Sequence, residues 1–238
     1  MHHIEVNGLV VNVVRKDIKN LHLAVYPPNG RIRVAAPLRV DDEAVRLAVI
    51  SRLAWIKRQQ TQFQEQERET EREYVSGESH YFQGSRYRLN VIYHDRAGQV
   101  TLRSKKIIDL FVRKGSSALQ RERIMQAWYR VHLRQVVPPL IAKWEKTIGV
   151  QAAEWGSKQM KTKWGACNIE ARRIWLKLEL AKKSPRCLQY IVVHELVHLL
   201  ERHHNDNFVN LMNKFMPQWR LHRAELNREP LAHVTWDY

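Results

Sequence analysis

The sequence predicts an α+β protein whose strands come mostly before its helices, and three observations support this prediction. Residues 4–36 and 86–113 are rich in β-branched and aromatic residues, with stretches of period-two alternation and intervening turn residues. Residues 118–148 and 184–200 instead repeat apolar residues at helical spacing. Apolar residues make up 44% of the 238 residues, which is enough for a sizeable core, and nine glycines are too few for a loop-dominated all-β protein.

The first β-rich segment is expected to contain a hairpin. Residues 21–25 and 31–34 flank the turn sequence Pro27-Pro28-Asn29-Gly30. One long helix is expected to follow, from residue 41 to about residue 74. Its second half, residues 59–73, is nearly all Gln, Glu and Arg, which predicts a solvated helix or, alternatively, an arm that binds a partner.

The second β-rich segment predicts a three-stranded meander over residues 87–93, 100–102 and 107–112. Together with the N-terminal hairpin, it is expected to form one small, mostly antiparallel β unit. No internal repeat is evident in the sequence. Because the composition changes near Ser116, we expect a β-rich N-terminal region with one long helix, residues 1–115. A helical region, residues 116–238, would complete a single integrated unit.

The helical region is expected to begin with a helix over residues 118–148. Pro138-Pro139 should kink or break this helix, and Gly149 should end it. Three short strands are expected next, at residues 152–155, 158–163 and 174–176. Ser184-Pro185 then predicts the start of a second helix, because serine caps a helix and proline fits its first turn.

Charge, cysteine content and hydropathy indicate which partners and which cellular compartment to expect. A formal net charge of +16 and a pI of about 10.1 favour contact with nucleic acid or another polyanion, although the basic residues are dispersed as on an ordinary basic surface. Cys167 and Cys187 form no C-x-x-C pair, which argues against a secreted disulfide framework and favours the cytoplasm. The sequence shows no signal-peptide pattern and no run of about 18 apolar residues, so no membrane association is expected.

The helix expected after Ser184 carries the motif His194-Glu195-x-x-His198. Residues four apart lie on one face of a helix, so both histidines could hold one zinc ion. Glu195 would then lie within reach of a water molecule on the metal. The alternative is two core histidines that bond to the backbone without a metal.

A third ligand has three candidates, which we rank as His204, His203 and Glu201. His204 can reach the metal only if the helix ends and the chain turns back. Metzincins use the same six-residue step from the second histidine, but they have glycine where this chain has Glu201, so the turn must form differently. Three neutral imidazoles would hold one zinc ion per chain and leave a position for water, whose proton Glu195 would accept.

The segments around this motif resemble a known family. They are Met160–Cys167, Ile174-Trp175-Leu176, Tyr190–His198 and His204–Phe208. Their order and spacing resemble the YgjP-like metallopeptidase family, which is related to the SprT and Spartan zinc proteases, and the resemblance covers nearly the whole chain. It implies a zincin-like fold, zinc ligands at His194, His198 and His204, a catalytic base at Glu195, and a peptide or protein substrate. Asn205 and Val209 depart from the serine and tryptophan that are usual in the family, without touching the ligand set.

The segment Lys161–Gly165 has two interpretations. It is either a strand edge that lines the substrate cleft, with Lys161, Lys163 and Trp164 facing the substrate, or a structural turn with Trp164 in the core. In the first case Lys161 or Lys163 could stabilise a developing oxyanion. Cys167 is expected to be a buried thiol and not a ligand.

The sequence therefore predicts a zinc-dependent metallopeptidase, and two alternatives stay open. The first is a metal-dependent nucleotide pyrophosphohydrolase, because an activated water can also attack phosphorus. The second is a nucleic-acid-associated, SprT-like protease or binding protein, which the net charge of +16 favours.

Overall fold

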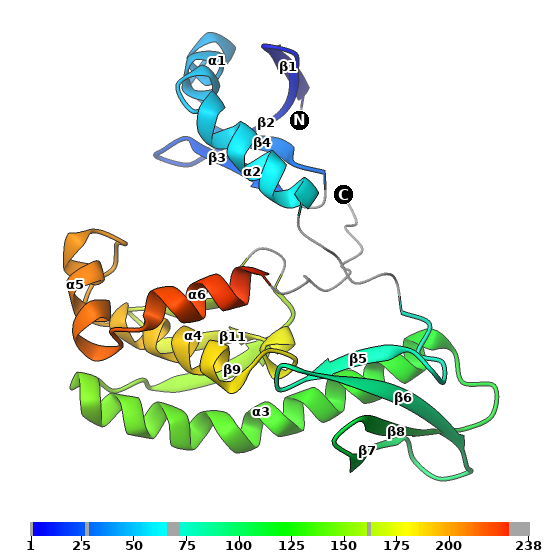
Figure 1. Cartoon of the computed structure of the whole chain (residues 1–238). Helices are drawn as coiled ribbons and strands as arrows, with labels where there is room; N and C mark the ends of the chain where they lie inside the picture. The colour runs from blue at the N-terminus through cyan, green and yellow to red at the C-terminus, as the bar shows by residue number, and fades with distance from the viewer. Residues whose placement is uncertain (1, 27–28, 66–71, 161–162, 229–238) are drawn as a thin grey trace. The chain divides into compact units, whose positions relative to one another are not determined.

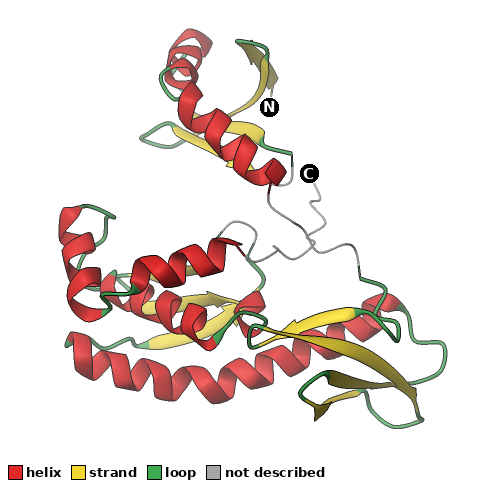
Figure 2. Cartoon of the chain, in the orientation of Figure 1, coloured by secondary structure: helices red, strands yellow, loops and turns green. Residues whose placement is uncertain are grey.

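The computed structural model describes residues 2–26, 29–65, 72–160 and 163–228, and it divides into two compact units, Met1–Glu67 and Arg68–Tyr238 (Figure 1). Each unit has its own hydrophobic core. This division differs from the boundary expected near residue 115. The reason is that the strands between residues 79 and 112 share one core with the long helix that follows them. Both units contain helices and strands, as expected for the α+β class (Figure 2).

The first unit is a four-stranded sheet followed by two helices. The elements are β1 (His2–Val6), β2 (Leu9–Lys16), β3 (His22–Tyr26), β4 (Arg31–Pro37), α1 (Asp42–Ile50) and α2 (Leu53–Glu65). The strands lie in the order β1-β2-β4-β3, with β2 and β4 parallel. The predicted hairpin is confirmed, since β3 and β4 pair antiparallel.

The prediction of a single helix from residue 41 to about residue 74 is wrong. Asp41 caps α1, its side chain accepting a hydrogen bond from the Ala44 amide, but α1 ends at Ile50 and a separate helix, α2, begins at Leu53. The buried face runs through Val45 and Val49, whereas Leu47 is exposed. The second half of the expected charged helix lies partly outside the described residues.

The second unit opens with another four-stranded sheet, formed by β5 (Ser79–Phe82), β6 (Ser85–Tyr93), β7 (Gln99–Ser104) and β8 (Ile107–Val112). Its order is β5-β6-β8-β7, so the expected meander is wrong. Strand β8 lies between β6 and β7 and runs parallel to β6. It is also the most buried of the four strands, which suits a central position better than an edge.

The two sheets share one topology, although the sequence shows no repeat. In both sheets a hairpin comes first, the second strand runs parallel to the fourth, and the third pairs antiparallel with the fourth. Both first hairpins turn on two residues of positive φ: Asn7 (48°) with Gly8 (75°), and Gln83 (49°) with Gly84 (76°). A helix follows the fourth strand in each case. The chain therefore contains a repeated ββββα unit.

The second of these turns contacts the residues that lead into the helix that bears the histidine motif. The amides of Gln83 and Gly84 donate to the carbonyls of Ala181 and Lys182, at 3.0 and 2.9 Å. A Cβ on Gly84 would lie 3.0 Å from the Cα of Ser184, whereas no described atom lies within 4 Å of such a Cβ on Gly8.

We expect Gly84→Ala to destabilise its unit more than Gly8→Ala destabilises the other. Both substitutions force alanine into the left-handed region, at a cost of about 1 kcal/mol. Only the first also displaces Ser184, which adds about 1–3 kcal/mol. Hydrogen exchange measured separately over the two units would give both losses. Equal losses would mean that the turn does not support the helix.

The long helix α3 (Ala118–Ile148) runs without a break. Ser117 and Gln120 form a capping box at its start, and Gly149 ends it with φ at 80°, as predicted. The expected break at Pro138-Pro139 is wrong. Both prolines are exposed, so water can satisfy the carbonyls that lose a partner in the preceding turn.

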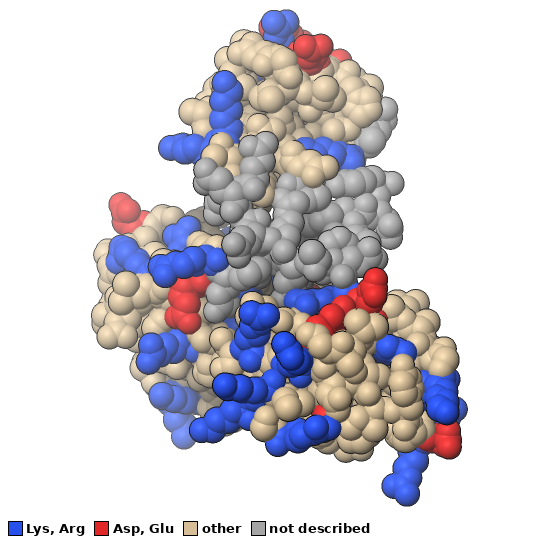
Figure 3. All heavy atoms as spheres, turned by 45° about the vertical axis from the view of Figure 1, so that its right-hand side comes forward, with Lys and Arg blue, Asp and Glu red and all other residues tan. Residues whose placement is uncertain are grey.

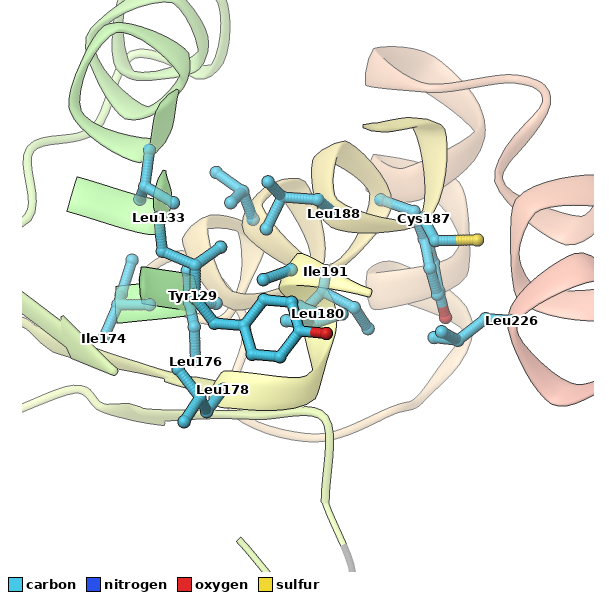
Figure 4. Packing of buried hydrophobic residues seen from close by; sticks show 14 of the residues in the cluster. Tyr129, Leu133, Ile174, Leu176, Leu178, Leu180, Cys187, Leu188, Ile191 and Leu226 are labelled. Carbon is cyan, nitrogen blue, oxygen red and sulfur yellow. The ribbon is translucent and has the colours of Figure 1, made fainter. Parts of the chain in front are cut away.

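The remaining elements build the layer that carries the motif. They are β9 (Glu154–Lys158), β10 (Gly165–Asn168), β11 (Arg173–Lys177), the short 3-10 helix η1 (Leu178–Ala181), α4 (Pro185–Val197), α5 (Asp206–Phe215) and α6 (Trp219–Arg228). Strand β11 is central and β10 is an edge strand. Side chains from α3, β11, η1, α4 and α6 meet in the core (Figure 4). No helix in the described part of the chain is long and apolar enough to cross a membrane.

Candidate functional site

Helix α4 places the two motif histidines one turn apart. The predicted start is confirmed: the Ser184 side chain accepts a hydrogen bond from the Cys187 amide, and Pro185 occupies the first turn. Most of the helix is buried, because it packs against α3, α5, α6 and β10. The last helical residue is Val197, so His198 lies at the point where the chain leaves the helix. The helix therefore ends inside the motif, and the chain can turn back.

The turn that follows brings His204 to the same place. The Nε2 atoms of His204 and His194 lie 3.0 Å apart, and one ring nitrogen from each of His194, His198 and His204 falls within 4.8 Å of the others. No other group of three potential ligands was found among the described residues, and this one includes neither His203 nor Glu201.

Glu201 forms part of the turn itself. One carboxylate oxygen accepts a hydrogen bond from the His203 amide and the other accepts one from the Asn207 side chain, both at 3.0 Å. Asn205 then caps α5 by accepting from the Phe208 amide. This arrangement answers how the chain turns without a glycine at position 201: a carboxylate ties the loop to the start of the next helix.

Phe208 holds the three rings in place. It is 2% exposed, and its ring centroid lies 4.9, 4.8 and 4.7 Å from those of His194, His198 and His204. The hydrogen-bond network adds a second constraint, since the Glu201 carbonyl lies 3.0 Å from His198 Nδ1 and accepts a hydrogen bond from its N–H group. That bond leaves Nε2 of His198 as the free donor atom for a metal.

The electrostatics favour neutral imidazoles. Burial, followed by the charges of His198 and His204, lowers the pKa of His194 to about 3. The pKa values of His198 and His204 are also lowered, mainly by burial. Zinc–nitrogen bonds of about 2.0–2.1 Å place tetrahedral ligands roughly 3.4 Å apart. The converging, deprotonated nitrogens therefore fit a metal ion of the zinc type.

Glu195 is buried beside the histidines. Its side chain points toward Gly165 of β10, where an added Cβ would lie 2.8 Å from the carboxylate carbon. Burial raises the pKa of Glu195 to about 8, and the positive charge of Lys163 opposes this shift. Near neutral pH, the metal-free site can thus hold a proton on this carboxyl group.

This raised pKa predicts a pH-dependent effect of Glu195→Gln on the stability of metal-free protein. Between pH 4.5 and 8 the folded protein keeps the Glu195 proton and the unfolded chain does not, so wild-type stability from this group is lost as pH rises. Glutamine does not titrate. As the pH rises across this range, the free energy of unfolding of the variant should increase relative to that of the wild type, by up to about 1.4 kcal/mol per pH unit. Urea unfolding in chelator from pH 5 to 9 would measure it, and a difference independent of pH would contradict it.

The histidines and Glu195 line a cavity of about 710 Å³ between β10, α4 and α6. Lys163, Trp164, Cys167, Tyr190 and Arg223 also line it. Trp164 lines the cavity and also packs against the core. Lys161 lies outside the described residues.

The cavity also corrects how Cys167 and Trp164 are understood. Cys167 is only half-buried and faces the cavity, although burial and the nearby Glu195 raise its thiol pKa to about 11. Two buried lysines lie close to the ring of Trp164, with the Nζ atoms of Lys177 and Lys183 at 4.9 and 5.6 Å from its centroid.

Sequence reasoning missed three cavity residues. Tyr190 lies one turn before His194 on the same helix, and the helical spacing could have revealed it. Gly165 was read only as part of a motif, although its missing side chain makes room for Glu195. Arg223 follows the motif by a whole helix and a turn, and no local pattern connects it with the site.

The site combines three histidine nitrogens with a buried glutamate, and the His-Glu-x-x-His motif lies at the end of helix α4. This arrangement is typical of metal-dependent hydrolases. The YgjP-like metallopeptidase-domain family matches residues 19–229, and the chain belongs to this family, as its sequence motifs predicted. The crystal structure of the metallopeptidase zymogen of Pyrococcus abyssi abylysin is similar to part of the chain. Identity is 19%, the TM-score is 0.36, and the match covers 40% of this chain and 100% of the other. No curated protein matches the sequence.

Proposed function

We propose that this chain is a zinc-dependent metallopeptidase with a zincin-like site, in which His194, His198 and His204 hold one zinc ion and Glu195 is the general base. The observation that carries the proposal is the convergence of three histidine ring nitrogens beside a buried carboxyl group, at the wall of one cavity. When bound by three imidazoles, zinc lowers the pKa of a water molecule to about 7 and polarises a carbonyl group.

Glu195 has the position and environment of a general base. Its carboxyl group lines the cavity beside the three histidines, and the positive charge of a bound metal ion would lower its raised pKa and favour the carboxylate that accepts a proton. Such a group accepts a proton from the attacking water and then delivers it to the amine that leaves. Lys163 lowers the pKa of Glu195 and faces the same cavity, so it also supports negative charge there.

Strand β10 supports a peptide as substrate. The Lys177 amide donates to the Trp164 carbonyl at 2.9 Å, so these two residues form a hydrogen-bonded pair of the antiparallel ladder. Hydrogen-bonded and non-hydrogen-bonded pairs alternate along such a ladder. The backbone N–H and C=O groups of Gly165 and Cys167 must therefore point away from β11, toward the edge of β10 that has no partner strand among the described residues. An extended peptide can add to such an edge as a further strand. Because Gly165 contacts Glu195, that peptide would pass beside the proposed base.

A matched pair of adjacent histidines tests the metal site. We expect His204→Ala to lower zinc affinity by at least about 100-fold and to abolish peptide hydrolysis, because a ligand is lost. His203→Ala should keep both properties, since His203 lies outside the cluster. Elemental analysis after dialysis, and hydrolysis before and after chelation, would measure the two effects. Equal zinc content in both variants would overturn the ligand set.

Nucleotide hydrolysis is the second candidate, because cations line the same cavity. Hydrolysis of nucleoside triphosphates, but of no peptide, by the zinc-loaded protein would select it over the metallopeptidase. The nucleic-acid-associated alternative predicts binding that weakens steeply with salt.

A further inference from the structure

Three cations surround the histidine cluster, and they come from three different parts of the second unit. Lys163 immediately precedes the Trp164–Gly165 entry into β10, Arg202 lies in the turn between His198 and His204, and Arg223 lies on α6. All three line the cavity and are exposed. Among the described lining residues the acidic ones are Glu170 and Glu195, and Glu195 is only 4% exposed.

None of the three cations forms an ion pair with a carboxylate in the described part of the chain. Other basic residues do: Arg103 pairs with Asp109, and Arg173 pairs with Glu154. The contrast is sharpest on α6 itself, where Arg220 donates to Asn213 Oδ1 at 2.7 Å and lies over the Trp219 ring. Arg220 is used within the fold, whereas Arg223 presents its charge to the cavity.

The charges of Lys163 and Arg223 act on the cluster from two elements. After burial and the other histidines, Arg223 is a further cause of the lowered pKa of His194. The charge of Lys163 lowers the pKa values of Glu195 and His198. Figure 3 shows that Lys and Arg outnumber Asp and Glu over the visible face of this unit. Unpaired like charges around a cation site repel one another, and an anionic ligand relieves that repulsion.

We propose that the cleft selects acidic peptides, with Lys163, Arg202 and Arg223 binding carboxylate side chains that flank the scissile bond. This inference rests on the proposed metallopeptidase function and names the substrate class for it. A peptide is favoured over a nucleotide or nucleic acid because the free edge of β10 offers backbone hydrogen bonds that only an extended polypeptide can match. Charge-assisted hydrogen bonds to carboxylates then supply the selectivity.

The test uses three peptides of equal length with blocked ends that differ only in Glu, Gln or Lys on both sides of one bond. With zinc-loaded full-length protein, kcat/KM should be about tenfold or more higher for the Glu peptide than for the Gln peptide, and lowest for the Lys peptide. The preference should shrink as salt rises. Arg223→Gln and Lys163→Gln should lower kcat/KM for the Glu peptide more than for the Gln peptide. Arg123→Gln, an exposed residue of α3 outside the cavity lining, is the matched control and should change neither.

Binding separates this inference from the proposed function. The same peptides, labelled, are titrated into zinc-loaded Glu195→Gln protein and followed by fluorescence anisotropy. One outcome is that the wild-type protein cleaves no peptide but the variant binds the Glu peptide at least tenfold more tightly than the Gln peptide. In that case the proposed function fails and the charge selectivity stands. Equal binding and cleavage of the Glu and Gln peptides would overturn the selectivity. So would displacement of the Glu peptide by nucleoside triphosphate or single-stranded DNA at lower concentration than by unlabelled Glu peptide.

Discussion

Glu195→Gln should reduce peptide hydrolysis by about 10²–10⁴-fold while the protein keeps its zinc. The amide has nearly the same shape as the carboxyl group but cannot accept the proton of the attacking water. Glu195 is 4% exposed, so no bulk water can easily replace it as a base. The measurement is kcat/KM on a peptide that the wild-type protein cleaves, with zinc content determined on the same sample.

Glu154→Gln is the matched control for this result. Glu154 lies on β9, is exposed, pairs with Arg173, and does not line the cavity. The same change of carboxylate to amide there should leave kcat/KM unchanged. Full activity in Glu195→Gln with normal zinc content would remove Glu195 from the role of general base.

Gly165→Ala should lower both stability and activity through Glu195. The three atoms nearest to an added Cβ all belong to Glu195, among them Cγ and Cδ, both at 2.8 Å. The backbone of Gly165 needs no left-handed conformation, so the side-chain conflict is the whole cost. Overpacking of this kind costs about 1–3 kcal/mol, and displacing the proposed base should lower kcat/KM as well.

A double-mutant cycle isolates the conflict. In a Glu195→Ala background the atoms that the new Cβ would meet are gone, so Gly165→Ala should cost little stability. Denaturant unfolding of the wild type, both single variants and the double variant gives the coupling energy. An equal loss in the two backgrounds would show that Gly165 is required for another reason.

Much of the candidate site could be predicted because its signals are local. Ser184 and Pro185 mark the start of α4, and the spacing of His194 and His198 places them on one face. The ranking of His204 over Glu201 followed from the six-residue step alone. The sequence could not show that Glu201 itself would tie the turn, since that depends on the side chain of Asn207 in the next helix.

The parts that could not be predicted depend on contacts between distant segments. Nothing in residues 99–112 states that β8 inserts between β6 and β7, because the strand order is decided by burial of the whole sheet. The unbroken helix at Pro138 and Pro139 reflects exposure, which propensity alone does not give. Arg223 joins the cavity only through the packing of α6 on α4.

The repeated ββββα topology has a consequence for the ancestry and engineering of the chain. Two copies of one strand order, each opening on the same two-residue turn, are what duplication of a single coding segment would leave. The surroundings of the two turns differ. The turn at Gln83-Gly84 contacts the segment that leads into the motif helix, and the turn at Asn7-Gly8 has no described atom within 4 Å of a Cβ on its glycine. Insertions and tags therefore belong at residues 7–8, where the hairpin has no such neighbour among the described residues.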